Sequence, residues 1–168
     1  MKRVITAAGL LVAFATTALA ADAPAQKPRP DIYDRKANGN QQIQEALKTA
    51  QAEHKRVLLK FGANWCGWCH KLSGLFHSNP EIAAQLKNNY VLVLIDVDQV
   101  DGHPHNDAIV QRYGNPTRFG LPVLVVLDSD GNRLTTQDTG QLEEGDHHDP
   151  RKVMAFLDKW KPVPASKP

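Results

Sequence analysis

Three apolar runs divide the chain and predict the buried strands of a sheet. They span Val57–Phe61, Val91–Val97 and Val123–Leu127, and polar residues or glycine bound each of them. Short, nearly continuous apolar runs are typical of strands that are covered on both faces. Residues 128–132 then form a turn pattern, Asp-Ser-Asp-Gly-Asn, so we expect residues 133–137 to return as an antiparallel strand.

Between the runs, apolar residues recur at spacings of three and four, which predicts amphipathic helices. The expected helices cover residues 40–54, 66–76, 80–89, 106–113 and 150–160. This order of elements predicts an α/β fold with a mixed, mostly parallel central sheet, an antiparallel edge hairpin and helices on both faces.

The first twenty residues have the pattern of a secretory signal peptide. Lys2 and Arg3 precede a mostly apolar stretch, and small residues allow cleavage after Ala20. The stretch is shorter than the roughly 20 residues that a spanning helix needs, so a membrane anchor is the weaker interpretation. We expect a periplasmic protein with an extended or disordered lead-in over residues 21–39, one domain over 40–160 and a frayed tail over 161–168.

Length and charge narrow the class of protein. A chain of 168 residues with 42% hydrophobic residues suits a single domain with one core. Loss of Lys2 and Arg3 with the signal segment leaves 18 basic residues against 18 acidic ones. A formally neutral chain gives no electrostatic reason to expect nucleic acid or an anionic membrane as a partner.

Both cysteines lie in one motif, Trp65-Cys66-Gly67-Trp68-Cys69-His70, directly after the first apolar run. Such a pair allows thiol–disulfide exchange, metal binding or haem attachment. A disulfide between them closes almost no loop, so it would be a poor structural staple. Zinc would need two further ligands, and the sequence has no second Cys-x2-Cys and no His-x3-His arrangement to supply them. The literal haem motif Cys-Gly-Trp-Cys-His follows a predicted buried strand, so haem remains a minor alternative.

From about residue 40 to 160 the chain resembles the thioredoxin superfamily. The likeness is carried by residues 61–69, Phe-Gly-Ala-Asn-Trp-Cys-Gly-Trp-Cys, after a buried strand, and by Gly120-Leu121-Pro122 before the third strand. Residues 76–82 and 127–131 look like those of an exported bacterial subgroup described as thiol-disulfide oxidoreductase-like. The resemblance implies a thioredoxin-like fold, a cis peptide bond before Pro122, and a redox-active Cys66–Cys69 disulfide with no other cofactor and no metal.

The two cysteines are expected to have different roles. Cys66 lies at the first turn of the predicted helix, where unpaired N–H groups favour a thiolate, so it is the expected nucleophile. Cys69, three residues further on the same face, is the expected resolving thiol.

Five neighbours are expected to shape the site or bind substrate: Trp65, Gly67, Trp68, Leu121 and Pro122. We expect Trp68 to face solvent and contact an incoming protein. Packing and site shaping are equally good interpretations of Trp65. Beside Pro122, the backbone of Leu121 would pair with an extended substrate segment.

Two basic residues are candidate modulators of the thiol pKa. Lys60 stands where many thioredoxins have a buried acid, and it could act as a cation or as a neutral base. We expect its stem to be buried and its ammonium group to reach solvent. His70 is expected to face solvent, as are His77, His103, His105, His147 and His148.

These observations predict a monomeric thiol-disulfide oxidoreductase, more specifically a reductase, which acts on protein disulfides or dithiols in the periplasm. A second redox protein would have to recharge its dithiol. The alternative is a non-catalytic thioredoxin-fold binding module that holds a partner near Pro122.

Overall fold

The computed structural model describes residues 29–100 and 102–163. The expected signal segment, residues 21–28 of the lead-in and residues 164–168 of the tail lie outside this part of the chain. No helix among the described residues is long and apolar enough to cross a membrane.

Four strands form the central sheet in the order β2-β1-β5-β6. They are β1 (Arg56–Gly62), β2 (Tyr90–Asp96), β5 (Val123–Leu127) and β6 (Arg133–Asp138). These are the three predicted apolar runs and the predicted returning strand, so the strand predictions are confirmed.

The expectation of a mostly parallel sheet is wrong. β1 and β2 are parallel, whereas β1 pairs with β5, and β5 with β6, in antiparallel orientation. A continuous apolar run indicates burial, and burial does not depend on the direction of the chain. Val123 pairs with Phe61, so the first residue of β5 lies beside the last residues of β1, at the same end of the sheet. This arrangement brings the segments that follow Phe61 and precede Val123 together.

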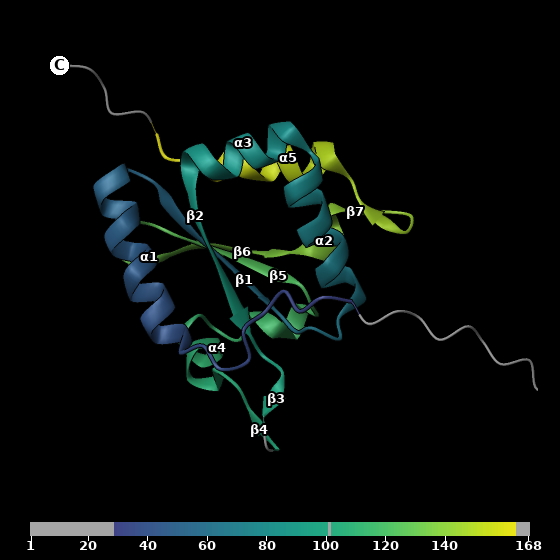
Figure 1. Ribbon diagram of the computed structural model, residues 1–168. Helices are drawn as coiled ribbons and strands as arrows, with labels where there is room; N and C mark the ends of the chain where they lie inside the picture. The colour runs from purple at the N-terminus through teal and green to yellow at the C-terminus, as the bar shows by residue number, and fades with distance from the viewer. Residues whose placement is uncertain (1–28, 101, 164–168) are drawn as a thin grey trace, which may run out of the picture.

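Helices cover both faces of the sheet, as Figure 1 shows. One face carries α1 (Gly39–Glu53) and α4 (Asp107–Arg112), and the other carries α2 (Gly67–Ser78), α3 (Pro80–Asn89) and α5 (Pro150–Trp160). Side chains alternate along a strand, so Leu59 of β1 packs beneath α1 while Leu58 packs beneath α2. The core is therefore two apolar layers that share one sheet.

Several short elements have no counterpart among the sequence predictions. The loop expected over residues 98–106 contains the hairpin β3 (Gln99–Val100) and β4 (His103–Pro104). Two 3-10 turns, η1 (Pro116–Phe119) and η2 (Thr139–Leu142), precede β5 and follow β6. A second hairpin, β7 (Glu143–Glu144) and β8 (His147–His148), lies beside α2 in Figure 1. Two-residue strands are too short to produce a detectable periodicity.

The described part of the lead-in packs against the domain. Residues 29–38 are extended or bent, but Tyr33 is only 2% exposed and contacts Cys66 and Cys69. Asn64 holds this segment, because its Oδ1 accepts hydrogen bonds from the backbone N–H groups of Ile32 at 2.9 Å and Tyr33 at 2.8 Å. The segment therefore contributes to the surroundings of the cysteines.

Candidate active site

The two cysteines form a disulfide at the N-terminus of α2, with Cα atoms 5.2 Å apart. Cys66 is the N-cap residue, and its Sγ accepts a hydrogen bond from the backbone N–H of Cys69 at 3.1 Å. The N-terminus of a helix stabilises negative charge, so a thiolate on Cys66 would be favoured here. Cys66 is 4% exposed and Cys69 is fully buried, so an incoming group reaches Cys66 first.

The approach to the disulfide depends on a glycine at the end of β1. A Cβ atom on Gly62 would lie 2.7 Å from Sγ of Cys69, closer than real Cβ contacts allow. The chain then turns through Ala63, whose carbonyl accepts a hydrogen bond from the N–H of Cys66 at 3.1 Å. Gly67 begins α2, and a Cβ there would make only one contact, at 3.4 Å from Arg29 Nη1. Close packing therefore requires a glycine at 62 and leaves room at 67.

Leu121 and Pro122 lie beside the disulfide because β5 starts at the end of the sheet where β1 finishes. The peptide bond between them is cis, and the Leu121 carbonyl oxygen is 3.5 Å from Cys66 Sγ. The Pro122 carbonyl accepts a hydrogen bond from the Thr139 hydroxyl. Thr139 is buried and was not among the predicted site residues, since its only sequence signal is a threonine after a strand.

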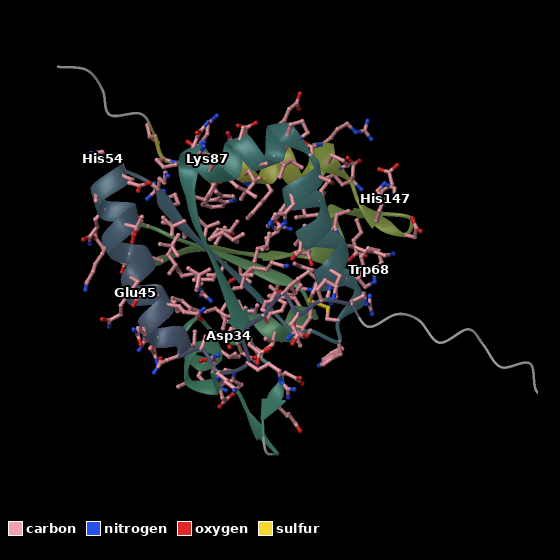
Figure 2. The ribbon with its side chains drawn as sticks, viewed as in Figure 1. Asp34, Glu45, His54, Trp68, Lys87 and His147 are labelled. Atoms are coloured by element: carbon pink, nitrogen blue, oxygen red, sulfur yellow. A yellow bond between two sulfur atoms is a disulfide. The ribbon has the colours of Figure 1, made fainter. Side chains whose placement is uncertain are left out.

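The two tryptophans of the cysteine motif differ in how far they are exposed to solvent. Trp65 is 65% exposed, and its Nε1 donates a hydrogen bond to Asp98 at 3.0 Å. Trp68, labelled in Figure 2, is half-buried, so it faces solvent only in part. The Lys71 ammonium lies 4.3 Å from the centre of its ring, and the His148 ring meets it edge-on at 5.3 Å. The exposed aromatic surface at this site belongs to Trp65.

Lys60 is buried beneath the disulfide, and the expectation that its ammonium group reaches solvent is wrong. The whole side chain is fully buried, and Nζ donates hydrogen bonds to the Cys69 carbonyl at 3.1 Å and to the Ser73 hydroxyl. Nζ also lies 5.2 Å from the centre of the Tyr33 ring. Burial lowers the pKa of Lys60 to about 7. The position at the end of β1, under a helix, leaves the amine no route to water.

Two histidines also differ from expectation. His70 is half-buried, and its Nε2 is hydrogen-bonded to the Asn64 carbonyl at 2.7 Å, so it fastens the loop before Cys66 instead of facing solvent. His148 of β8 is buried against Trp68. Burial, with the nearby charges of Lys60, Lys71 and His147, lowers the pKa of His148 to about 4. Among the described residues, no cluster of three or more His, Cys, Asp or Glu converges on a point that could hold a metal ion.

A thioredoxin-like family matches residues 39–129, which include β1, both cysteines, Leu121 and Pro122. The chain belongs to the thioredoxin-like family. Its fold matches the crystal structure of a disulphide isomerase from Xylella fastidiosa with a TM-score of 0.67 and 33% identity, over 76% of this chain and 95% of that one.

Curated relatives of this thioredoxin-like chain are longer proteins. It is 25% identical over 120 residues to the thiol:disulfide interchange protein DsbD of Ralstonia nicotianae, covering 71% of this chain and 19% of that protein. It is 31% identical over 98 residues to DsbD of Colwellia psychrerythraea, covering 58% and 15%. The chain thus spans less than a fifth of the length of these relatives.

The family and the geometry of the Cys66–Cys69 pair both indicate thiol–disulfide exchange. This thioredoxin-like protein is a thiol-disulfide oxidoreductase whose Cys66–Cys69 pair is present as a disulfide.

Proposed function

We propose that this chain is a periplasmic reductase of protein disulfides, with Cys66 as nucleophile and Cys69 as resolving thiol. The main support for these roles is the unequal burial of the two cysteines. Cys66 is slightly exposed and follows the exposed Trp65, whereas Cys69 is fully buried. The signal-like pattern over residues 1–20 supports export.

The proposed reaction has two exchanges. The Cys66 thiolate attacks one sulfur of a substrate disulfide, forms a mixed disulfide with it, and releases the other sulfur as a thiolate. Cys69 then loses its proton and attacks Sγ of Cys66, which releases the second substrate thiolate and forms the Cys66–Cys69 disulfide. Two electrons pass to the substrate, and a partner dithiol must return two electrons before the next cycle.

Substrate contact is proposed on two sides of Cys66. The Leu121 carbonyl, 3.5 Å from Cys66 Sγ, is placed to accept a hydrogen bond from the backbone of an extended segment that passes the sulfur. The indole of Trp65, one residue before Cys66, offers an exposed flat apolar surface as the second contact. An isomerase is the second candidate, since the similar Xylella structure bears that name.

Insulin reduction with dithiothreitol as electron donor tests the proposal. Wild-type protein should accelerate insulin precipitation, and Cys66→Ser should remove the acceleration because no nucleophile remains. In a separate reaction without dithiothreitol, pre-reduced Cys69→Ser should accumulate mixed disulfides with insulin through Cys66, visible on non-reducing gels. A folded wild-type protein that does not accelerate the reaction would support the binding-module alternative. Faster refolding of a scrambled substrate without net reduction would favour the isomerase.

A further inference from the structure

Tyr33 of the lead-in packs against the two cysteines. Its side chain is 2% exposed and belongs to one buried cluster with Cys66 and Cys69. Its backbone is fixed from both sides by Asn64, which accepts from the Tyr33 N–H at 2.8 Å and donates from Nδ2 to the Tyr33 carbonyl at 2.9 Å. Because Asn64 stands two residues before Cys66, the ring is tied to the loop that carries the nucleophile.

Gly62 locates the Tyr33 hydroxyl relative to Cys69. A Cβ atom on Gly62 would stand 2.7 Å from Sγ of Cys69 and closer still to the Tyr33 hydroxyl oxygen. Since neither of these two distances exceeds 2.7 Å, the Tyr33 hydroxyl oxygen lies less than twice 2.7 Å from Sγ of Cys69. Gly62 therefore contributes no side chain at the position next to both atoms.

In the oxidised protein the Tyr33 hydroxyl makes no hydrogen bond to the described residues. It is buried and has no hydrogen-bond partner among the described residues, which is an unfavourable state for a polar group. Burial, and secondarily the charge of Asp96, raise the pKa of Tyr33, so the hydroxyl keeps its proton and can donate it in a hydrogen bond. It needs an acceptor within reach.

We propose that the Tyr33 hydroxyl donates a hydrogen bond to Sγ of Cys69 when the disulfide is reduced, and that Tyr33 thereby sets the redox poise of the pair. This inference rests on the proposed redox function of the same site. A disulfide sulfur is a weak acceptor, whereas the freed Cys69 sulfur of the reduced pair accepts more strongly, and most strongly once it loses its proton to attack. The hydrogen bond thus stabilises the reduced form selectively.

The electron and proton balance leaves Tyr33 unchanged. A partner dithiol passes two electrons and its two protons to the Cys66–Cys69 disulfide and becomes a disulfide itself. The S–S bond breaks, and whichever thiol ionises releases its proton to solvent. The Tyr33 O–H bond stays intact, and its hydrogen turns toward Sγ.

Asp96 offers a competing acceptor. Its Oδ1 is also buried without a partner among the described residues, and its charge acts on Tyr33. A hydrogen bond from Tyr33 to Asp96 would not require reduction of the disulfide. It would change the stability of the fold and leave the equilibrium between disulfide and dithiol unchanged, which separates the two interpretations.

The test is the equilibrium of the full chain with reduced and oxidised glutathione, measured for wild type and Tyr33→Phe. Loss of the hydroxyl should shift the equilibrium about tenfold toward the disulfide, a potential about 30 mV more negative. Tyr113→Phe is the matched control, because Tyr113 is a buried tyrosine in the other core layer, on the α1 and α4 side. Its equilibrium should equal that of wild type.

Two results would overturn the inference: an unchanged glutathione equilibrium in Tyr33→Phe, or an equal shift in Tyr113→Phe. Thermal unfolding of the oxidised proteins establishes that both variants are folded. If a variant at Tyr33 lost its fold, Asn64→Ala would replace it, since it frees the Tyr33 backbone and should shift the equilibrium in the same direction. The glutathione equilibrium does not require substrate turnover, so failure of insulin reduction and failure of the Tyr33 effect are independent outcomes.

Discussion

At the scale of single residues, Lys60 is the most unusual group in the molecule. A fully buried amine normally has a carboxylate partner, yet Nζ contacts only the Cys69 carbonyl, the Ser73 hydroxyl and the Tyr33 ring among the described residues. Burial lowers the pKa of Lys60 to about 7, so the amine is part neutral and part charged near neutral pH. A proton on Lys60 would favour a thiolate on the cysteine above it.

Lys60 should make the stability of the fold depend on pH. Its pKa is about 7 in the folded chain and about 10.5 in the unfolded chain, so the unfolded state binds an extra proton between these values. The free energy of unfolding should therefore rise with pH across this window, by several kcal/mol in all, since each tenfold change in proton affinity is worth about 1.4 kcal/mol. Lys60→Met should remove this rise in urea unfolding measured from pH 6 to 10.

Lys87→Met is the control for that experiment, because Lys87 lies exposed in the last turn of α3 and should leave the pH profile unchanged. Measurements stay below about pH 10, where buried Tyr33 and Tyr90, whose pKa values are raised by burial, begin to lower stability. A wild-type profile parallel to that of Lys60→Met would contradict a neutral buried amine.

At the scale of elements, the hairpin of β7 and β8 supports the N-terminal half of α2. His148 of β8 packs edge-on against Trp68, and Lys71 of α2 donates a hydrogen bond to the Asp146 carbonyl in the hairpin turn. The hairpin thus holds Trp68 against the protein, which is why the residue between the cysteines is half-buried. Trp65, on the loop before α2, has no such support and stays exposed.

Replacing His148 should stabilise the protein most at low pH. Both ring nitrogens are buried without hydrogen-bond partners among the described residues, and His148→Phe keeps the edge-on contact while it removes them. At neutral pH the variant should gain about 1 kcal/mol. The pKa of His148 is about 4 when folded and 6.5 when unfolded, so wild-type stability rises with pH between these values, and the advantage of the variant near pH 4 should reach about 3 kcal/mol more.

Urea unfolding at pH 4 to 8 measures this difference. His147→Phe is the matched control, since its side chain is 62% exposed in the same strand and the substitution should leave stability almost unchanged. Equal pH profiles for wild type and His148→Phe would show that the imidazole is protonated equally in both states.

At the scale of the whole molecule, the sheet brings two segments that are distant in the sequence together at one end of its strands. Cys66 follows β1 and Leu121 precedes β5, and the antiparallel pairing of these strands places them in contact although 55 residues separate them. Helices cover both faces of the sheet, as Figure 1 shows. The site is therefore a property of the sheet topology as much as of the cysteine motif.

Export is the prediction that belongs to the whole chain. If residues 1–20 are a cleaved signal, protein collected from the periplasm should begin at Ala21. N-terminal sequencing or the intact mass decides this. Protein that still carries Met1 and sediments with membranes would instead indicate an anchor.

Much of the architecture was accessible from periodicity. The strands around Leu58, Leu92 and Leu124 and the helix around Leu72 follow from apolar runs and spacings, because burial selects apolar residues wherever the chain folds. The short hairpins and 3-10 turns were missed, since two to four residues carry no periodic signal. Strand direction was also missed, because an apolar residue is equally buried in either orientation.

The sequence by itself determined the chemistry: two thiols at the start of a helix, a glycine and a proline at fixed places around strands, and an apolar pattern for each layer. Only the tertiary structure decided how that chemistry is surrounded. Burial of Lys60, Tyr33 and His148 depends on contacts between segments that are far apart in the sequence, and such contacts lie beyond any local pattern. The surroundings of Cys66 and Cys69 depend on long-range packing, whereas their reactivity as a pair depends on local spacing.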